Sequence, residues 1–236
     1  MAKLYWINVD AHTERRVHME CHLNDHGYLN QRVEALTPKR LPSNPGSRSE
    51  LEYACLFSHF EALRLAGRES NADWALVSED DIHICGLFDV SEIARSAPAD
   101  AEILQLTSIN AGIYEPWISG KVNHQKLWVP WKTHHSGTQF YAVKLVSILD
   151  KLRQVSVAMS LELEEHNSVK LNRYNFVHVA DEYIYQLFRT YTSKIPFAFG
   201  DYKFGSYVNR DDEKFHRWSW PVVESFAKSS IVTEIH

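Results

Sequence analysis

Three consecutive carboxylates, Glu79–Asp81, follow an apolar run of strand length that begins at Trp74. A short, nearly continuous apolar run is typical of a buried parallel strand. In open α/β sheets, ligands bind beyond the carboxyl ends of the strands, where these acids would lie. Adjacent carboxylates repel one another and need either solvent or a cation. The stretch therefore predicts a site for a divalent cation that also touches a diphosphate, or else a solvated acidic turn.

Two further groups of polar residues could take part in chemistry. Arg15 and Arg16 fall in the first turn of a predicted helix, where the helix dipole disfavours cations, so they indicate either an anionic partner or solvated surface arginines. Asp181 and Glu182 follow an apolar stretch and open another helix, so they are either helix-capping acids or a catalytic base. His59 lies among apolar residues of a helix, which favours a hydrogen-bonded core histidine over a substrate contact.

The composition excludes several classes of protein. The formal net charge of -5, with no basic stripe, argues against a nucleic-acid-binding protein. No apolar run approaches the ~20 residues that span a membrane, and a strand pattern that starts at Leu4 leaves no room for a signal peptide. The cysteines are odd in number and form no CxxC pair, which indicates reduced thiols. We therefore expect a cytoplasmic protein, and its 236 residues suffice for one large domain.

Apolar strands alternate with helices along the chain, which predicts an α/β fold with a mainly parallel central sheet and flanking helices. The stretch 154–173 fits either a helix or an exposed strand. Strands are predicted over 4–9, 32–36, 75–79, 103–109, 139–143, 176–180 and 195–199, and helices over 13–26, 50–66, 89–97, 145–152 and 181–190.

Four short segments occur in a fixed order. They are INVD at Ile7–Asp10 with Arg15 and Arg16 after it, EYACLFSH at Glu52–His59, ALVSEDD at Ala75–Asp81, and GTQFYAV at Gly137–Val143. This series resembles the INLD…R…R, E-ACxxSH, ALILEDD and GTxxYxV segments of the glycosyltransferases of family 25. That family includes lipopolysaccharide galactosyltransferases and collagen-type hydroxylysine galactosyltransferases. Weaker similarities at Val179–Asp181 and Phe204–Val208 extend the resemblance over residues 4–208.

The resemblance implies a single GT-A-type domain. Its donor-nucleotide half would cover about residues 1–110, its acceptor half about 111–208, and a C-terminal tail 209–236. It also implies an inverting hexosyltransferase that moves a sugar from a nucleotide-sugar, expected to be a UDP-linked hexose, to a hydroxyl of a glycan or glycoprotein. The chain departs from the family pattern over 154–175 and at Ala180, which replaces a proline, so the identity of the acceptor stays open.

The resemblance further implies a metal-assisted reaction. Asp81 would coordinate Mn²⁺ or Mg²⁺ in the manner of a DxD motif, while Glu79 or Asp80 would act through water or the donor ribose. Inversion needs a base on the face opposite the leaving group, and Asp181, followed by Glu182, is the candidate. Asp201, which stands where the pattern leads us to expect an amide, is assigned to the metal with Glu79 and Asp81. The residues assigned to the donor are Asn8, Asp10, Arg15, Arg16, Ser58, His59, Asp80, Gly137 and Thr138.

Two other functions remain open at this stage. A metal-dependent nucleotide-sugar or phosphoester hydrolase could use the same acids, although a two-metal site would need more clustered ligands and the sequence shows no second DxD-like run. A non-catalytic glycan-binding relative could keep the fold without the chemistry, and the intact acids speak against it.

Overall fold

A computed structural model describes residues 2–40, 49–69, 72–115, 127–154, 179–201, 204 and 219–225, and the structural statements below concern these residues. The stretch 155–175 and most of the strand predicted over 176–180 lie outside them. The elements in chain order are β1 (Leu4–Asn8), α1 (Thr13–Asp25), β2 (Asn30–Glu34), η1 (Pro38–Arg40), α2 (Glu50–Glu69), β3 (Trp74–Glu79), β4 (Ile82–Ile84), α3 (Val90–Arg95), β5 (Ile103–Gln105), η2 (Ala111–Ile113), β6 (Trp128–Pro130), β7 (Phe140–Lys144), α6 (Ala180–Leu187), β8 (Thr190–Ser193) and β9 (Ala198–Gly200). Residues 145–154 and 219–225 are also helical.

Seven strands form one mixed sheet in the order β2-β1-β3-β7-β5-β8-β6. The pairs β1–β2, β1–β3 and β5–β8 are parallel, whereas β7 is antiparallel to both β3 and β5, and β6 is antiparallel to β8. Five strands therefore run in one direction and β7 and β6 run in the other. The predicted α/β fold with flanking helices is confirmed, but the sheet is mixed rather than mainly parallel, since three of its six neighbouring pairs are antiparallel. A second, two-stranded sheet pairs β4 with β9.

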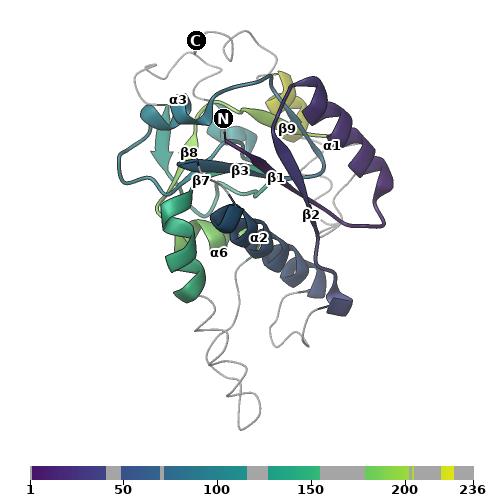
Figure 1. The fold of residues 1–236 in the computed structure, drawn as a ribbon. Helices are drawn as coiled ribbons and strands as arrows, with labels where there is room; N and C mark the ends of the chain where they lie inside the picture. Colours follow the sequence, from purple (N-terminus) through teal and green to yellow (C-terminus); the bar gives the residue numbers. More distant parts are fainter. Residues whose placement is uncertain are drawn as a thin grey trace.

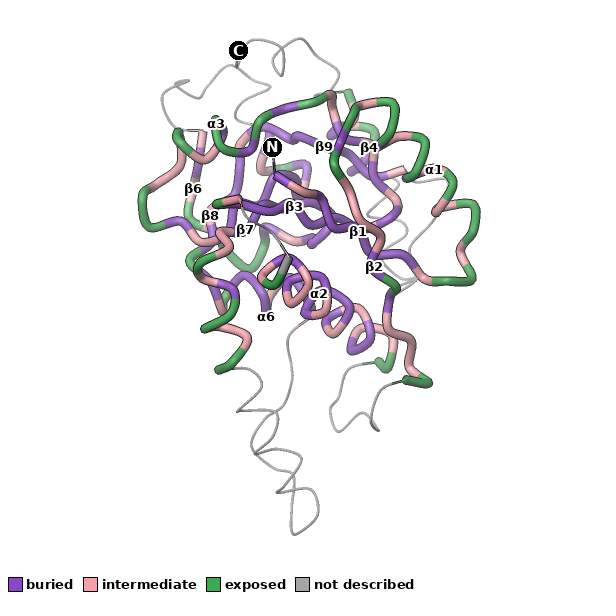
Figure 2. The backbone as a smooth tube through the Cα atoms, in the orientation of Figure 1, coloured by how far each residue is buried: buried purple, intermediate pink, exposed green. Residues whose placement is uncertain are grey.

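Helices cover both faces of the large sheet, because successive residues of a strand point to opposite sides. In β1, Leu4 and Trp6 belong to the core cluster that contains side chains of α1 and α3, whereas Tyr5 and Ile7 belong to the cluster that contains side chains of α2 and α6. Figure 1 shows α1 and α3 on one side of the sheet and α2 and α6 on the other. Figure 2 shows that the strands between them are mostly buried. Each large apolar side chain buried in this way stabilises the fold by about 1.5–3 kcal/mol.

The topology creates a crevice at the carboxyl ends of β1 and β3. From β1 the chain passes through α1 to β2 on one side, and then through α2 to β3 on the other side of β1. Such a reversal of strand order is where open α/β sheets bind ligands. Ile7 of β1 pairs with Glu79 of β3, so the acidic stretch begins beside the end of β1.

Several predicted boundaries are wrong, and the reason is packing. Strand β5 ends at Gln105 although the buried run continues, because Leu106 and Thr107 both direct their N–H groups to the carbonyl of Phe140. Helix α2 continues through Gly67, whose missing Cβ allows Ile148 and Leu149 to approach closely. The last strand lies at Ala198–Gly200 rather than 195–199, and helix α6 ends at Leu187, after which β8 forms. Strand β6 was not predicted at all.

Candidate active site

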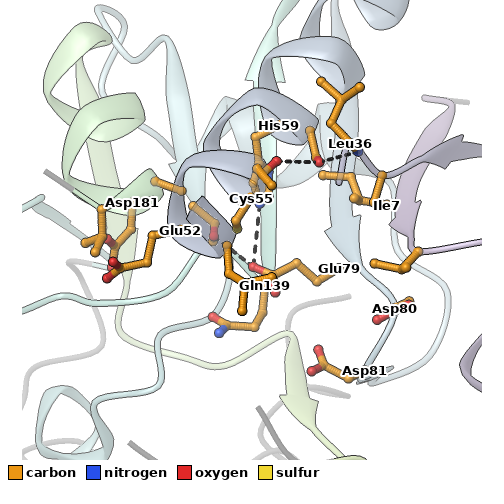
Figure 3. Close-up of a pocket in the computed structure, with 18 of the residues that line it drawn as sticks. Ile7, Leu36, Glu52, Cys55, His59, Glu79, Asp80, Asp81, Gln139 and Asp181 are labelled. Atoms are coloured by element: carbon orange, nitrogen blue, oxygen red, sulfur yellow. Dashed lines mark hydrogen bonds and ion pairs between the residues drawn. The ribbon is translucent and has the colours of Figure 1, made fainter. Parts of the chain in front are cut away.

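A pocket of about 480 Å³ lies at the crevice. Its walls come from the ends of β1 and β3, the segment after β2, the first half of α2, the loop before β7 and the start of α6. In the close-up of Figure 3, Asp80 and Asp81 lie on one side, Asp181 lies on the other, and Cys55 and His59 project from α2 between them. A pocket of this size is typical of a small-molecule site.

Both carboxylate oxygens of Asp80 accept hydrogen bonds from other side chains of the protein. One carboxylate oxygen accepts a hydrogen bond from Asn8 Nδ2 (2.6 Å), and the other accepts one from Arg15 Nη1 (2.9 Å). Asp80 is 5% exposed, so this pair of contacts satisfies a charge that burial would otherwise penalise. The structure therefore brings together three residues that were predicted to bind the donor. Asn8 and Arg15 both hydrogen-bond to Asp80, so the three side chains fix one another in place.

The carboxylate of Asp81 has fewer hydrogen-bonding partners than that of Asp80. Its Oδ2 lies 3.3 Å from Arg15 Nη1, while its buried Oδ1 accepts no hydrogen bond from any described residue. Burial raises the pKa of Asp81 to about 8; Arg15 opposes this shift, and the neighbouring Glu79 and Asp80 add to it. A carboxylate in this environment gains most from a cation that arrives with a ligand.

Glu79 is held as an anion. Its Oε1 accepts a hydrogen bond from the Thr138 hydroxyl (2.8 Å) and lies 3.5 Å from His59 Nε2. Burial raises the pKa of Glu79, but His59, Thr138 and Arg15 together outweigh burial and bring the pKa below its ordinary value. His59 is 1% exposed and its Nδ1 is hydrogen-bonded to the Tyr141 hydroxyl (3.2 Å), whereas its buried Nε2 makes no hydrogen bond to any described residue; it is both a core histidine and part of the pocket wall.

Asp181 lies at the other end of the pocket, at the second position of α6. Its Oδ2 accepts a hydrogen bond from the backbone N–H of Gly137 (2.7 Å) and its Oδ1 accepts one from the N–H of Glu182 (2.8 Å). Burial raises the pKa of Asp181 despite these two bonds. Gly137 has a φ of +106°, and a Cβ there would collide with Gln139, so only glycine fits the turn that orients Asp181.

Other predicted residues lie outside the described pocket wall. Arg16 donates hydrogen bonds to the carbonyl oxygen (2.7 Å) and the carboxylate (2.8 Å) of Asp10, and Arg32 donates to the same carboxylate (2.6 Å). The hydrogen bond from Arg32 lowers the pKa of Asp10. The predicted residues that are not among the described residues of the pocket wall are Asn8, Asp10, Arg16, Glu182 and Asp201.

Two predicted residues have a clear structural task. The hydroxyl of Ser58 donates to the Ala54 carbonyl (2.6 Å) and accepts from the N–H of Leu36 (2.8 Å), so Ser58 fixes the segment after β2 against α2. Asp201 lies at the end of β9, where its N–H bonds to the Asp81 carbonyl (2.7 Å) and its Oδ2 lies 3.1 Å from His83 Nε2. Asp201 therefore supports Asp81 through the backbone, while its carboxylate contacts a histidine.

The sequence analysis missed part of the wall. Ala35–Pro38 after β2, Cys55 on α2, and Gln139 beside Gly137 all line the pocket. For Cys55 and Gln139 a signal was present, because both stand inside segments that resemble the glycosyltransferase family. For Ala35–Pro38 there was none, since a proline-containing loop does not reveal what it faces.

Comparisons with known proteins give limited matches. No protein-family model matches the sequence, and no curated protein matches it. Among solved structures, the chain is similar to a glycosyltransferase involved in the glycosylation of the major capsid of PBCV-1, with 11% identity, 92% of this chain and 98% of that chain covered, and a TM-score of 0.49. It is also similar to the protein A197 from STIV, with 10% identity, coverage of 84% and 83%, and a TM-score of 0.43. Within the described residues, no helix is long and apolar enough to cross a membrane.

Proposed function

We propose that this protein is a glycosyltransferase that moves a sugar from a nucleotide-sugar to a hydroxyl of a glycan or glycoprotein, with inversion. The proposal rests on one observation: a single pocket contains carboxylates on two separate elements. One, at the end of β3, has a negative charge that its neighbours balance only in part, and the other lies on α6. Asp81 and Asp181 come from different elements and lie at opposite ends of the pocket. The resemblance of four sequence segments to family 25 supports the same activity.

The pocket offers different environments to the two parts of a nucleotide-sugar. Apolar side chains, including Ile7, Leu36 and Ala54, line the part between β1, the segment after β2 and α2, where a nucleoside would be buried. The acids at the end of β3 lie next to this part. A diphosphate would meet Glu79 and Asp81 there, and two groups of like charge need a cation between them.

The described residues supply some of the ligands that a divalent cation needs. Asp81 supplies a buried carboxylate oxygen without a hydrogen-bond donor, and Glu79 supplies an anionic carboxylate beside it. Oxygen donors of this kind suit Mn²⁺ or Mg²⁺. Asp201 does not belong to the described pocket wall, so we propose Glu79 and Asp81, without Asp201, as the protein ligands. When bound, the cation would neutralise charge that develops on the leaving nucleoside diphosphate.

Asp181 is the proposed general base. The N–H groups of Gly137 and Glu182 hold its carboxylate in one orientation, and each of its oxygens retains lone-pair capacity for the proton of an acceptor hydroxyl. Burial raises its pKa, which strengthens it as a base. Glu182 is not among the described pocket residues, so Asp181 is the better candidate of the two.

A panel of nucleotide-sugars with simple glycan acceptors tests the proposal. We expect release of a nucleoside diphosphate that depends on the acceptor and on Mn²⁺ or Mg²⁺, and loss of this release in Asp81→Asn. Asp150→Asn is the matched control, because Asp150 is an exposed acid paired with Arg153 outside the pocket. Acceptor-independent release of free sugar or of a nucleoside monophosphate would instead identify a hydrolase. Binding without turnover of any nucleotide-sugar would identify a non-catalytic relative.

A further inference from the structure

A cluster of imidazole rings lies on the side of β4 outside the described pocket wall. His18 from α1, His83 from β4 and Asp201 at the end of β9 each present a potential ligand atom, and these atoms lie within 4.8 Å of one another. His18 and His83 meet edge to face with ring centroids 4.6 Å apart, and His22, one turn after His18, stacks parallel to it at 5.9 Å. Neither the proposed donor site nor the proposed base uses these residues.

We propose that His18, His83 and Asp201 bind a transition-metal ion of the Zn²⁺ type, separate from the cation proposed at Glu79 and Asp81. Three residues from three elements that converge on one point are the usual source of such a site. Two imidazoles and one carboxylate leave a further coordination position for water.

The distances suit one shared ion. His83 Nε2 and Asp201 Oδ2 are 3.1 Å apart. Two ligands bound at about 2.0–2.2 Å to one ion lie about 2.8–3.6 Å from each other, depending on octahedral or tetrahedral geometry. The observed pair therefore needs little movement to share a metal, and the potential ligand atoms of all three residues lie within 4.8 Å of one another.

The surroundings hold the histidines in suitable orientations. His18 Nε2 lies 3.2 Å from the Ile82 carbonyl oxygen, which ties the ring of His18 to β4. The N–H of Ile84 donates to His22 Nε2 (2.8 Å), which fixes α1 against β4 on either side of His83. Phe199 stacks on the His83 ring at 5.1 Å. These contacts orient the rings before any ion arrives, which lowers the cost of binding.

The ligand set selects the metal. Imidazole nitrogen suits Zn²⁺, Ni²⁺, Cu²⁺ and Fe²⁺, whereas Mg²⁺ and Mn²⁺ prefer sites made only of oxygen ligands. The two proposed cation sites therefore differ in selectivity. An ion at this cluster would tie α1, β4 and β9 together next to Asp81, whose carbonyl already accepts a hydrogen bond from Asp201.

Calorimetric titration of chelator-treated protein with ZnCl₂ and with MgCl₂ tests the site. We expect Zn²⁺ to bind and Mg²⁺ to leave these residues unoccupied. His18→Ala and His83→Ala should each weaken Zn²⁺ binding by at least about 100-fold, because they remove a direct ligand and even outer-shell changes cost 10–100-fold. The matched control is His134→Ala, an exposed histidine outside the cluster, which should bind Zn²⁺ like the wild type.

Two further controls separate this site from the pocket. Asp81→Asn should leave Zn²⁺ binding unchanged. Cys55→Ala removes a ligand from a second group of potential ligands that also contains His59 and Glu79, and should likewise leave it unchanged. Loss of Zn²⁺ binding in either variant, or equal binding by His83→Ala and the wild type, would overturn the proposal.

Anomalous diffraction at the zinc edge keeps the test decisive if a histidine variant fails to fold. Crystals of the wild-type protein soaked in Zn²⁺ should show a peak between His18, His83 and Asp201. A peak only elsewhere, or no binding of Zn²⁺ by the wild type, would refute the site regardless of how the variants behave.

Discussion

Asp81→Asn should abolish turnover and, in the absence of divalent cations, make the protein more stable. The substitution keeps the shape of the side chain and removes one of three adjacent negative charges. In the wild type the nearest described cation is Arg15, 3.3 Å from Oδ2, and it is shared with Asp80. The variant keeps the Arg15–Asp80 pair and loses the Arg15–Asp81 contact, but burial, the largest cause of the raised pKa of Asp81, no longer penalises a charge at this position.

The magnitude follows from the shift in pKa. Burial and neighbouring acids raise the pKa of Asp81 from 3.8 to about 8. Each unit of difference between folded and unfolded pKa is worth about 1.4 kcal/mol, so the penalty near neutral pH is at most about 4 kcal/mol. Because 21% of the side chain is exposed and solvent screens the charge, we expect about 1–2 kcal/mol in the free energy of unfolding.

The pH dependence has a definite sign. Below about pH 4 Asp81 is protonated in both the folded and unfolded states, so it causes no penalty. As the pH rises toward about 8, the unfolded state ionises first and folding becomes less favourable. The stabilising effect of Asp81→Asn should therefore be absent at acid pH and grow through this window, because other titrating groups are common to both proteins.

Urea denaturation across this pH range, in the presence of EDTA, measures the effect. Asp150→Asn, an exposed acid, should show no comparable dependence on pH. Addition of Mn²⁺ should raise the stability of the wild type and not that of Asp81→Asn, since a ligand that binds only the folded state stabilises it. A variant that is less stable than the wild type at all pH values, or a difference that does not change with pH, would refute the reasoning.

Three other predictions concern the pocket and the residues that the sequence assigned to it. Asp181→Asn should lower kcat by about 10²-fold or more with donor affinity unchanged, whereas Glu182→Gln should retain most activity; the reverse result in steady-state kinetics would place the base elsewhere. Gly137→Ala should destabilise the fold and lower kcat, since an alanine at this positive φ would be strained and would shift the N–H that orients Asp181; thermal unfolding and kinetics measure both, and a wild-type kcat contradicts it. Arg16→Ala should leave the donor titration curve unchanged, and a clear rise in Kd would restore the donor contact predicted from the sequence.

The sequence was sufficient for the elements that carry their own local signal. The apolar run before Glu79 predicted β3, because a strand buried on both faces needs apolar residues throughout. The start of the predicted helix over 50–66 agrees with that of α2, where Ser49 and Glu52 form the reciprocal hydrogen bonds of a capping box. The helix predicted over 89–97 corresponds to α3, where Asp89 is the N-cap and accepts a hydrogen bond from the N–H of Ser91. In each case the information lies within a few residues of the element it specifies.

The short strands were not accessible from sequence. Strand β8, at Thr190–Ser193, contains polar residues, yet three of its four residues are buried, because β5 and β6 flank it. Strand β6 has only three residues, including a proline. A strand of this length is defined by its neighbours, since its hydrogen bonds are all made to residues far away along the chain.

The site shows the same division between local pattern and tertiary contact. The sequence by itself determined that Glu79, Asp80 and Asp81 would lie together at the end of a strand, because adjacency in the chain guarantees it. Only the tertiary structure decided their different states: Asp80 accepts hydrogen bonds from Asn8 and Arg15, Glu79 accepts one from Thr138, and Asp81 is left with a buried oxygen that no described residue satisfies.

The histidine cluster depended on tertiary structure even more. His18 and His22 are one helical turn apart, a spacing that the sequence displays but that does not by itself indicate a ligand set. Their neighbour His83 is more than sixty residues away, and Asp201 pairs with His83 across 118 positions. The strand pairing of β4 with β9 brings the last two together. Distances of this kind are set by how the sheets and helices pack, and no local pattern encodes them.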